Sequence, residues 1–457
     1  MERTKIARKA LSADGMISNL KNCFKNIPEH RLNTENIEYS ISDTALSGFS
    51  MFSLKYPSVL SFTKDGRGET VEGKNLRSLY QIGKVPSDTQ MRAILDNVDT
   101  KEFRGSFLKL FSEAQRGGVL KNFEFMDGKY LAAFDGTGVY SSDSVHCDCC
   151  MEKVSKKTGK ISYYHQTVGV SIIHPEIKQV IPLCPEPIQK QDGATKNDCE
   201  RNATKRVLDD LTREHPRLNL IIVEDALSAN APHIRKISSC GYSYILGVKP
   251  GDHKYLFDWV DALGGDDLKV HSFYKIIGQK VKKKITYNFK WYNGVPLNDS
   301  NHDLLVNFLD FEEITETLDI DGKVIKTKRS LWSWVTDIKI TKDNVYQIMR
   351  GGRARWRIEN EVFNTLKNQG YNLEHNFGHG FKNLCNNFIM LMMLAFLVDQ
   401  LQEIACSTFK KALKVAERKK YLWRKIKGRF ENWILDTWET LLNTIITPPA
   451  VVAPNSG

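Results

Sequence analysis

The chain has 457 residues, of which 41% are hydrophobic, and its 65 Lys and Arg outnumber its 54 Asp and Glu to give a net charge of +11. This length and apolar content allow a large core spread over two or three structural units, and they exclude a disordered protein. The positive charge indicates a polyanionic partner such as nucleic acid, although charge alone leaves a role in solubility open.

The cysteine count and the apolar runs bear on the compartment. Nine cysteines, in a chain whose first residues lack the apolar core of a secretory signal, indicate a reducing cytosol. The longest apolar run, Phe388–Val398, has 11 residues, whereas a bilayer-spanning helix needs about 20. We therefore expect this run to form a buried helix, in a soluble cytoplasmic protein without a membrane partner.

Residues 1–125 are expected to form a mainly helical N-terminal region. The segments with helical periodicity or helix-capping residues are Ile17–Phe24, Asp43–Phe52, Thr89–Leu95 and Lys101–Leu120. None of them carries an obvious chemical motif. A DNA-end-binding unit and a subdomain that serves only for packing are equally compatible with the pattern.

The pattern changes at Lys129, where short apolar strands begin to alternate with helical segments. The predicted strands are Tyr130–Phe134, Tyr163–Ile173, Gln179–Leu183, Leu220–Val223 and Tyr244–Val248. Predicted helices follow the third and fourth strands, the first with Asp198 as its N-cap and the second over Ile234–Ser239. This order predicts a mixed α/β sheet over residues 126–250.

In residues 251–340, apolar and polar residues alternate between turn-forming pairs. The alternating stretches are Ser272–Ile277, Lys284–Trp291 and Val324–Trp334, and the turn pairs are Asn293-Gly294 and Asp321-Gly322. They predict an inserted antiparallel β subdomain. Residues 341–400 return to the core through a helix over Arg353–Lys367 and the buried helix. Residues 401–457 are expected to form a basic helical tail with a disordered end at 447–457.

Two of the predicted strands end at an aspartate, and a third carboxylate lies on the Arg353–Lys367 helix. Asp135 follows YLAAF and Asp225 follows LIIVE, and small or polar residues after each leave space beside its carboxylate. Functional groups collect at the carboxyl edge of such a sheet. If the helix brings a glutamate to the same place, three carboxylates can hold two Mg²⁺ or Mn²⁺ ions about 4 Å apart for in-line phosphodiester chemistry.

Two glutamates compete for the third place. On a helical wheel drawn at about 100° per residue, Glu359 falls in the same apolar arc as Trp356 and Ile358, whereas Glu361 falls on the polar side. A carboxylate on a packed face needs a metal ion or a partner, and Arg355, one turn earlier, is the alternative partner. The wheel therefore favours Glu359, with Glu361 as its rival.

The carboxylates lie in four characteristic segments. These are FDGTGVYSS around Asp135, QDGATKNDCERNATKRVL at 191–208, VEDALSANAPHI around Asp225, and GRARWRIENEVFNTLKNQGYNLEHNFGHG from residue 352. Together they resemble the DDE transposases of bacterial insertion sequences, in the insertion-sequence-4-like group, over most of the chain from about residue 40 onward. The resemblance implies an α/β fold with a ribonuclease-H-like mixed-sheet core, interrupted by an antiparallel β insertion and flanked by helical N- and C-terminal regions.

The resemblance also implies an activity. Asp135, Asp225 and Glu359 would bind two Mg²⁺ or Mn²⁺ ions, and the enzyme would cut the ends of a mobile element and join the freed 3′-OH to target DNA. The implied partners are double-stranded DNA and a second copy of the chain on that DNA, in a bacterial cytoplasm and at the nucleoid. The alternatives are a ribonuclease-H-like nuclease without strand transfer and a catalytically inactive DNA-binding relative.

The last segment departs in part from the family pattern Tyr-x2-Arg-x3-Glu-x6-Lys. Arg355 and Glu359 fit its Arg-x3-Glu part. Gly352 stands at the Tyr position, and Lys367 comes one residue late. Because the family's Arg and Lys contact phosphates near the cleaved end, the resemblance implies DNA-binding roles for Arg355 and Lys367.

A Cys-rich loop, His146–Lys160, offers a second set of candidate ligands. Its Cys147 and Cys150, with His165 beyond the loop, could bind Zn²⁺. A second Cys pair at matching spacing is missing, so the pattern favours free thiols. Two later histidines, His375 and His379, are expected to order their loop or to contact DNA.

Two stretches of the chain are strongly basic. They are Lys280 with Lys282–Lys284, and ten Lys and Arg between Lys410 and Arg429 with aromatic residues interleaved. Such density suits a phosphate backbone, and a solvated helix face is the alternative for each run. Trp291, Trp332 and Trp334, in the predicted insertion, could stack on a flipped base or pack within the insertion.

Overall fold

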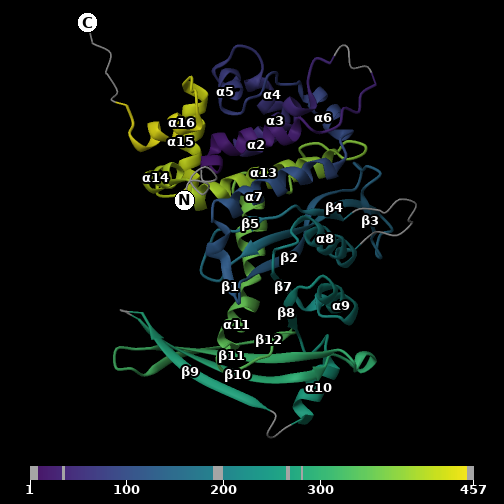
Figure 1. Ribbon diagram of the computed structural model, residues 1–457, viewed down its shortest axis with the longest axis vertical. Coiled ribbons are helices and arrows are strands. Elements are labelled where there is room, and N and C mark those ends of the chain that lie inside the picture. Colours follow the sequence, from purple (N-terminus) through teal and green to yellow (C-terminus); the bar gives the residue numbers. More distant parts are fainter. Residues whose placement is uncertain (1–8, 33–36, 189–198, 264–267, 279–280, 450–457) are drawn as a thin grey trace.

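The computed structural model describes residues 9–32, 37–188, 199–263, 268–278 and 281–449. The molecule is elongated, with a helical unit at one end, a sheet covered by helices in the middle and long antiparallel strands at the other end (Figure 1). Asp198, Lys280 and residues 450–457, to which some of the sequence predictions refer, lie outside the described residues.

One sheet runs through the middle and lower parts of the molecule in the order β3-β4-β2-β7-β8-β12-β11-β10-β9, and β1, β5 and β6 pair beside this path. Its strands are β1 Glu124–Met126, β2 Lys129–Ser142, β3 Met151–Val154, β4 Ile161–Ile173, β5 Ile181–Pro182, β6 Glu186–Ile188, β7 Leu220–Glu224, β8 Ser243–Val248, β9 Lys269–Ile277, β10 Lys282–Pro296, β11 Leu305–Leu318 and β12 Val324–Thr336. Strands β2, β7 and β8 are parallel, and their neighbours pair antiparallel. The predicted mixed α/β sheet is therefore confirmed.

Helices cover the parallel part of the sheet. α8 (Glu200–Glu214) precedes β7, and α9 (Ala231–Ser239) connects β7 to β8. Every residue of β7 is buried, which explains its uninterrupted apolar sequence, because a parallel strand is covered on both faces. The short strand β3 forms inside the predicted Cys-rich loop, where no strand was predicted.

The predicted insertion begins with α10 (Lys254–Leu263) and continues as β9 to β12. It does not form a separate sheet, because β12 pairs with β8 between Thr336↔Ile245 and Ser333↔Val248. The Asp321-Gly322 pair makes a turn between β11 and β12, as predicted. The prediction of a turn at Asn293-Gly294 is wrong, because β10 continues through a bulge there, with Gly294 at φ 76°.

The helical end of the molecule combines the two termini of the chain. Its helices are α2 Ala13–Phe24, α3 Ile41–Ser53, α4 Val59–Gly66, α5 Val71–Leu79, α6 Asp88–Asp96, α7 Arg104–Arg116, α14 Ser407–Ala416, α15 Lys419–Asn432 and α16 Trp438–Ile446. The Asn75 side-chain amide donates to the carbonyls of Phe430 and Trp433, both at 2.7 Å. The backbone N–H of Trp438 donates to the Asp14 carboxylate at 2.9 Å. The basic tail is therefore folded onto the N-terminal helices.

Helix α13 (Leu384–Ala405) lies between this unit and the sheet. Its length and apolar composition would allow it to cross a membrane, but 94% of its most apolar stretch of 18 residues is buried inside the molecule. It contains the run Phe388–Val398, so the prediction of a buried helix is confirmed. A core helix of this kind is consistent with a soluble protein.

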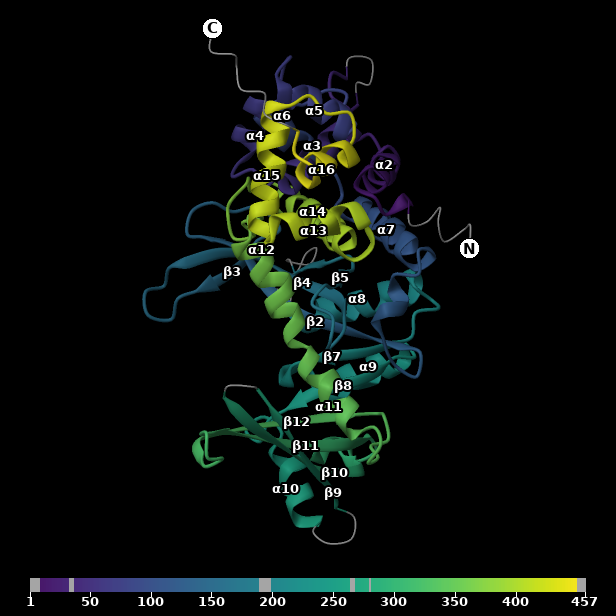
Figure 2. The ribbon, with the colours of Figure 1, turned by 90° about the vertical axis from the view of Figure 1, so that its left-hand side faces the viewer.

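The segment around Glu359 is not one regular α-helix. It consists of α11 (Val345–Ala354), a π-helix over Ile358–Phe363 and α12 (Asn364–Asn368). Figure 2 shows this stretch in green, running along the sheet from the β9–β12 strands to the helical unit. A π-helix carries more residues per turn than an α-helix, and such turns are frequent at functional sites.

Candidate active site

Asp135 and Asp225 lie at the same level on neighbouring strands. β2 and β7 run parallel in a register that pairs Ala133 with Val223, so two residues further along Asp135 comes level with Asp225. Neighbouring strands are about 4.8 Å apart. The prediction that Asp135 follows the end of its strand is wrong, because β2 continues to Ser142. Asp225 does follow β7, and its carboxylate accepts the Leu227 N–H at 3.0 Å.

Arg355 joins the first aspartate to Glu359. Its guanidinium lies 3.5 Å from an Asp135 carboxylate oxygen and donates to Glu359 Oε1 at 2.6 Å. The Arg355 side chain is largely buried, at 16% exposure. The strand and the helical segment, which are more than 200 residues apart in sequence, therefore place two of the three predicted carboxylates around one cation.

A fourth carboxylate, Glu200, belongs to the same cluster and was missed by sequence analysis. Glu200 is the first residue of α8, and its side chain lies over Gly136, where a Cβ would come within 2.3 Å of Glu200 Oε2. A larger residue at this position would displace the Glu200 carboxylate. Burial raises the pKa of Glu200, and the charges of Asp225 and Glu224 raise it further. Its place in the first turn of a helix inside one of the characteristic segments was the available signal.

The four carboxylates influence one another electrostatically. Burial raises the pKa of Asp135 to about 7, Arg355 opposes this effect, and Glu200, Glu359 and Asp225 add to it. A buried carboxyl that shares its surroundings with other anions holds its proton more tightly. A divalent cation would relieve this repulsion, and an all-oxygen donor set is the kind that Mg²⁺ and Mn²⁺ prefer. Among the described residues, however, the group whose ligand atoms lie close enough together to hold a metal ion is a Cys/His group elsewhere in the sheet, and it includes none of these carboxylates.

Glu359 and its rival pair with different arginines, and of these only Arg355 also lies beside Asp135. Glu361 pairs with Arg357 at 3.4 Å, and Arg357 also donates to the Pro175 carbonyl at 2.9 Å. The expected burial was wrong, because the Glu361 side chain is 20% exposed and that of Glu359 is 42% exposed. The π-helix changes the angular spacing of its residues, so a wheel drawn for an α-helix misplaces them.

Two other positions of the family pattern differ in their surroundings from what the resemblance implies. Lys367 forms an ion pair with Glu374 at 2.7 Å, one helical segment away from the carboxylate cluster. Gly352 stands against the ring of Trp334, and a Cβ there would come within 2.4 Å of Trp334 Nε1. The indole thus fills the space beside the position where the family has a tyrosine.

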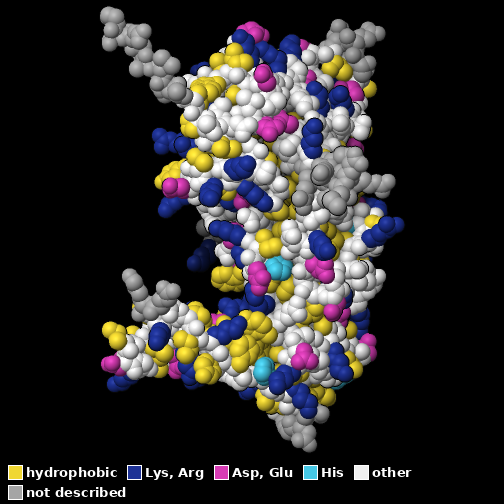
Figure 3. All heavy atoms as spheres, turned by 60° about the vertical axis from the view of Figure 1, so that its left-hand side comes forward, with side chains coloured by type: hydrophobic (Ala, Val, Ile, Leu, Met, Phe, Trp, Pro, Cys, Tyr) yellow, Lys and Arg dark blue, Asp and Glu magenta, His cyan; other side chains and the backbone are white. Residues whose placement is uncertain are grey.

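A large hollow opens beside the carboxylate cluster. It has a volume of about 990 Å³, and Asp225, Arg355 and Trp356 line it together with Lys249 and Trp332 of the sheet. Figure 3 shows one face of the molecule, where a notch separates the protruding β9–β12 strands from the body and Lys and Arg side chains lie above it. The hollow beside the candidate site is therefore lined by both acidic and basic side chains.

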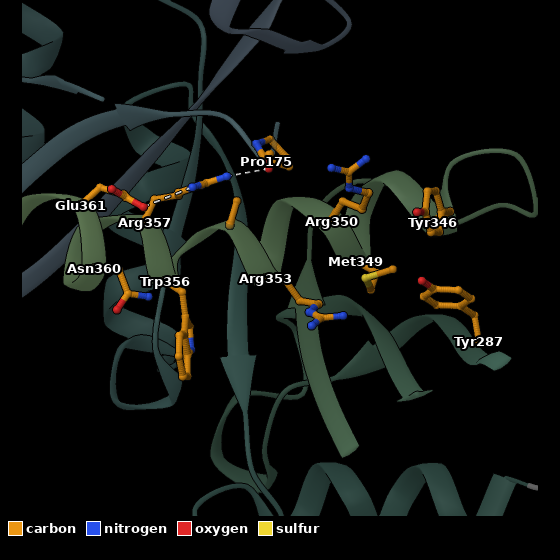
Figure 4. A pocket seen from close by; sticks show the side chains of 11 residues that line it. Pro175, Tyr287, Tyr346, Met349, Arg350, Arg353, Trp356, Arg357, Asn360 and Glu361 are labelled. Carbon is orange, nitrogen blue, oxygen red and sulfur yellow. Dashed lines mark hydrogen bonds and ion pairs between the residues drawn. The ribbon is translucent and has the colours of Figure 1, made fainter. Parts of the chain in front are cut away.

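Figure 4 shows a second hollow, of about 520 Å³, on the neighbouring surface of α11 and the π-helix. Arg350, Arg353 and Arg357 come from successive turns and line it with Trp356 and two tyrosines. Trp356 is 60% exposed, so its predicted place on the buried face is wrong. Arginines and aromatic rings in one hollow are the side chains that contact phosphates and bases.

The three tryptophans of the β strands have different environments. Trp291 and Trp334 are buried, whereas Trp332 is partly exposed, stacks on Phe311 and lies beneath Arg353 at 4.5 Å. Core packing accounts for the first two. Trp332 and Trp334 both line the large hollow, and Trp332 is the more exposed of the two, so base stacking stays a prediction for Trp332.

The three predicted zinc ligands lie together in a different part of the sheet. Cys147, Cys150 and His165 are buried, and His379 joins them to form a group that could hold a metal ion. His379 was not among the predicted zinc ligands, because 229 residues separate it from Cys150. His375, by contrast, packs edge-on against Phe377.

Some Lys side chains of the two basic stretches form ion pairs, and others are exposed to solvent. In the C-terminal stretch, Lys419 pairs with Glu403 at 2.6 Å and Lys427 lies 3.6 Å from Glu431. The other members are largely exposed on α14 and α15. Lys282 to Lys284 lie on β10, where Lys284 is 3.5 Å from Glu316.

No protein-family model matches the chain, and no curated protein matches it at a significant level. The function must therefore be inferred from the residues and the geometry described above.

Proposed function

We propose that this protein is a DDE-type DNA transposase with a ribonuclease-H-like core, and that Asp135, Asp225 and Glu359 form its metal-binding triad. The observation that carries the proposal is the pairing of Asp135 on β2 and Glu359 in the π-helix with Arg355, while the register of β2 and β7 puts Asp225 level with Asp135. The parallel β2-β7-β8 core with its connecting helices supports the fold assignment.

The protein groups would each have a defined part in the reaction. Bound Mg²⁺ or Mn²⁺ ions would supply an activated attacking oxygen and stabilise the leaving oxygen of the phosphodiester. Asp135, Asp225 and Glu359 would hold those ions, and Glu200 would add negative charge beside them. The raised pKa of Asp135 means that cation binding competes with a proton near neutral pH.

Arg355 would act as a phosphate contact. In the structure its guanidinium pairs with Asp135 and Glu359 and also lines the large hollow. When cations neutralise the carboxylates, the guanidinium is released to bind a phosphate with its planar fork. Lys367 is a weaker candidate for this role, because it already pairs with Glu374.

The substrate would be double-stranded DNA at the ends of a mobile element, followed by target DNA. The large hollow, Trp332 and the arginines of Figure 4 provide charge and stacking surfaces next to the carboxylates. A homodimer on paired DNA ends, in the bacterial cytoplasm, belongs to the same proposal through the family resemblance alone.

The deciding experiment is a Mn²⁺-dependent nicking and joining assay on DNA that carries the ends flanking the gene. Asp135→Asn, Asp225→Asn and Glu359→Gln should each abolish nicking and leave DNA binding intact. Glu361→Gln is the matched control and should cut normally, because Glu361 pairs with Arg357 outside the cluster.

The outcomes separate the candidate functions. Nicks together with joined products support the transposase. Nicks without joined products indicate a nuclease, and binding without nicks indicates an inactive relative. An active Glu359→Gln enzyme with an inactive Glu361→Gln enzyme would transfer the third ligand to Glu361.

A further inference from the structure

Four buried side chains from distant parts of the chain lie close together beside β4. Cys147 and Cys150 come from the loop between β2 and β3, His165 from β4, and His379 from the loop between α12 and α13. Each offers one ligand atom, and these four atoms lie within 4.8 Å of one another. All four residues are less than 9% exposed.

The distances between these atoms match the edges of a zinc tetrahedron. Metal–sulfur and metal–nitrogen bonds of about 2.3 and 2.0 Å at tetrahedral angles put two sulfurs about 3.8 Å apart and a sulfur and a nitrogen about 3.6 Å apart. The two Sγ atoms are 3.9 Å apart. His165 Nε2 lies 3.3 Å from each sulfur, and His379 Nε2 lies 3.0 Å from that of Cys150.

The alternatives account for the group less well. A disulfide requires sulfurs about 2.05 Å apart, and both cysteines are free. The Nδ1 atoms of both imidazoles are buried without a hydrogen-bond partner among the described residues. The sulfurs are therefore the main polar contacts of two buried rings, although thiols are weak hydrogen-bonding groups. Two Nε2 atoms directed at two cysteine sulfurs are the arrangement that a bound metal satisfies, although the metal would not partner the Nδ1 atoms.

We propose that Cys147, Cys150, His165 and His379 hold a structural Zn²⁺ ion. A closed set of four protein ligands leaves no open position for a substrate, which is the arrangement of structural rather than catalytic zinc. The site is separate from the carboxylate cluster, and it stands whether or not the protein is a transposase.

The ion would fasten the loop of residues 369–383 to the sheet. On its other side this loop is already held by Asp96, whose carboxylate accepts the backbone N–H groups of Phe381, Lys382, Asn383 and Leu384 at 2.8 to 3.0 Å. The same loop carries Glu374, the partner of Lys367. Zinc would thus fix the chain between the helical segment that bears Glu359 and the start of α13.

The test is the metal content of the full-length protein, purified from zinc-supplemented cells and measured by mass spectrometry. We expect about one zinc per chain, because the site has one complete ligand set. Cys147→Ser, Cys150→Ser, His165→Ala and His379→Ala should each lose most of it. Cys149→Ser and His375→Ala are matched neighbours and should keep it. A metal-free wild type, or equal loss from the control variants, would overturn the proposal.

A second measurement needs no variant of the ligands. Co²⁺ exchanged into the wild-type protein should give the visible bands of a tetrahedral ion and a near-ultraviolet thiolate-to-metal band. The Cys149→Ser and Asp135→Asn proteins should give the same spectrum, because neither residue is a ligand. A spectrum without the thiolate band would overturn the proposal even if the ligand variants fail to fold.

Discussion

Asp135 carries the clearest electrostatic signature of any single residue in the candidate site. Its side chain is 21% exposed and faces Arg355, yet burial and the neighbouring carboxylates outweigh that cation and raise its pKa to about 7. A group whose pKa is raised on folding binds its proton more tightly in the folded state. The folded state therefore loses stability as the pH rises from about 4 to about 7.

Asp135→Asn should consequently stabilise the protein at pH 8 in the absence of added Mg²⁺ or Mn²⁺. The gain should be at most about 4 kcal/mol, because each pKa unit corresponds to about 1.4 kcal/mol. It should shrink on acidification and vanish below about pH 4. Urea unfolding at several pH values measures it, with the exposed Asp258→Asn as control. A pH-independent gain would contradict the assignment.

Gly352 gives a steric prediction at the scale of one residue. A Cβ at this position would lie 2.4 Å from Trp334 Nε1, so Gly352→Ala should cost about 1–3 kcal/mol in the free energy of unfolding. Gly428, also in a helix, has open space around it. Gly428→Ala should therefore stabilise the protein by up to about 1 kcal/mol. Thermal unfolding of both variants checks the contrast.

Asp135, Asp225 and Glu359 were predicted from local signals, and those signals held only in part, because β2 continues past Asp135 and Glu359 lies in a π-helix rather than on a packed α-helical face. Glu200 and His379 were missed for the opposite reason. The Glu200 carboxylate lies over Gly136 of a distant strand, and His379 meets Cys150 across 229 residues. Contacts of this kind depend on tertiary structure, which periodicity does not encode.

At the scale of elements, the prediction was accurate where the hydrophobic pattern was regular. The core strands and four of the N-terminal helical segments appeared where they were expected. The wheel failed over residues 356–361, because the π-helix there breaks the 3.6-residue period. Asn293-Gly294 has the composition of a hairpin turn, yet the Asn293 side chain bonds to both the N–H and the carbonyl of Ile340 at 2.9 Å, and the strand continues as a bulge.

The end of α3 is attached to α13 by a buried ion pair, which gives a prediction for two elements. Lys55 Nζ lies 2.8 Å from Asp399 Oδ2 and over the ring of Tyr371. Burial lowers the pKa of Lys55 to about 8 despite the opposing charge of Asp399. Asp399→Ala should cost about 3–5 kcal/mol, because it leaves a buried cation unpaired.

The matched control replaces both members of the pair. Lys55→Met with Asp399→Leu removes both charges at similar volume and should cost much less than Asp399→Ala alone. Urea denaturation of the single and double variants measures the difference. A double variant as unstable as the single one would mean that packing, rather than the unpaired charge, sets the cost.

For the whole molecule, the distribution of basic residues predicts salt-dependent DNA binding. Lys420, Arg424 and Lys425 are exposed on α15, which is folded onto the N-terminal helices. Replacing all three by alanine should weaken binding and reduce the slope of log affinity against log salt by up to about 3, since each phosphate contact contributes about 0.9. Filter binding at several salt concentrations measures the slope.

A variant of equal net charge controls for the general loss of positive charge. Lys25, Lys101 and Lys121 are exposed residues of the N-terminal region, and their replacement by alanine should change the slope less. Equal slopes in the two triple variants would place the DNA contacts elsewhere, for example along the arginines of the two hollows.

The pairing of β12 with β8 joins the core strands and the long strands into one continuous β-sheet. Because hydrogen bonds connect the two parts of this sheet, we expect the long strands that carry Trp332 to keep a fixed position relative to the acidic cluster. A DNA duplex that binds in the large hollow must then change its own shape. We therefore expect DNA sequences that kink easily to bind more tightly than stiff ones.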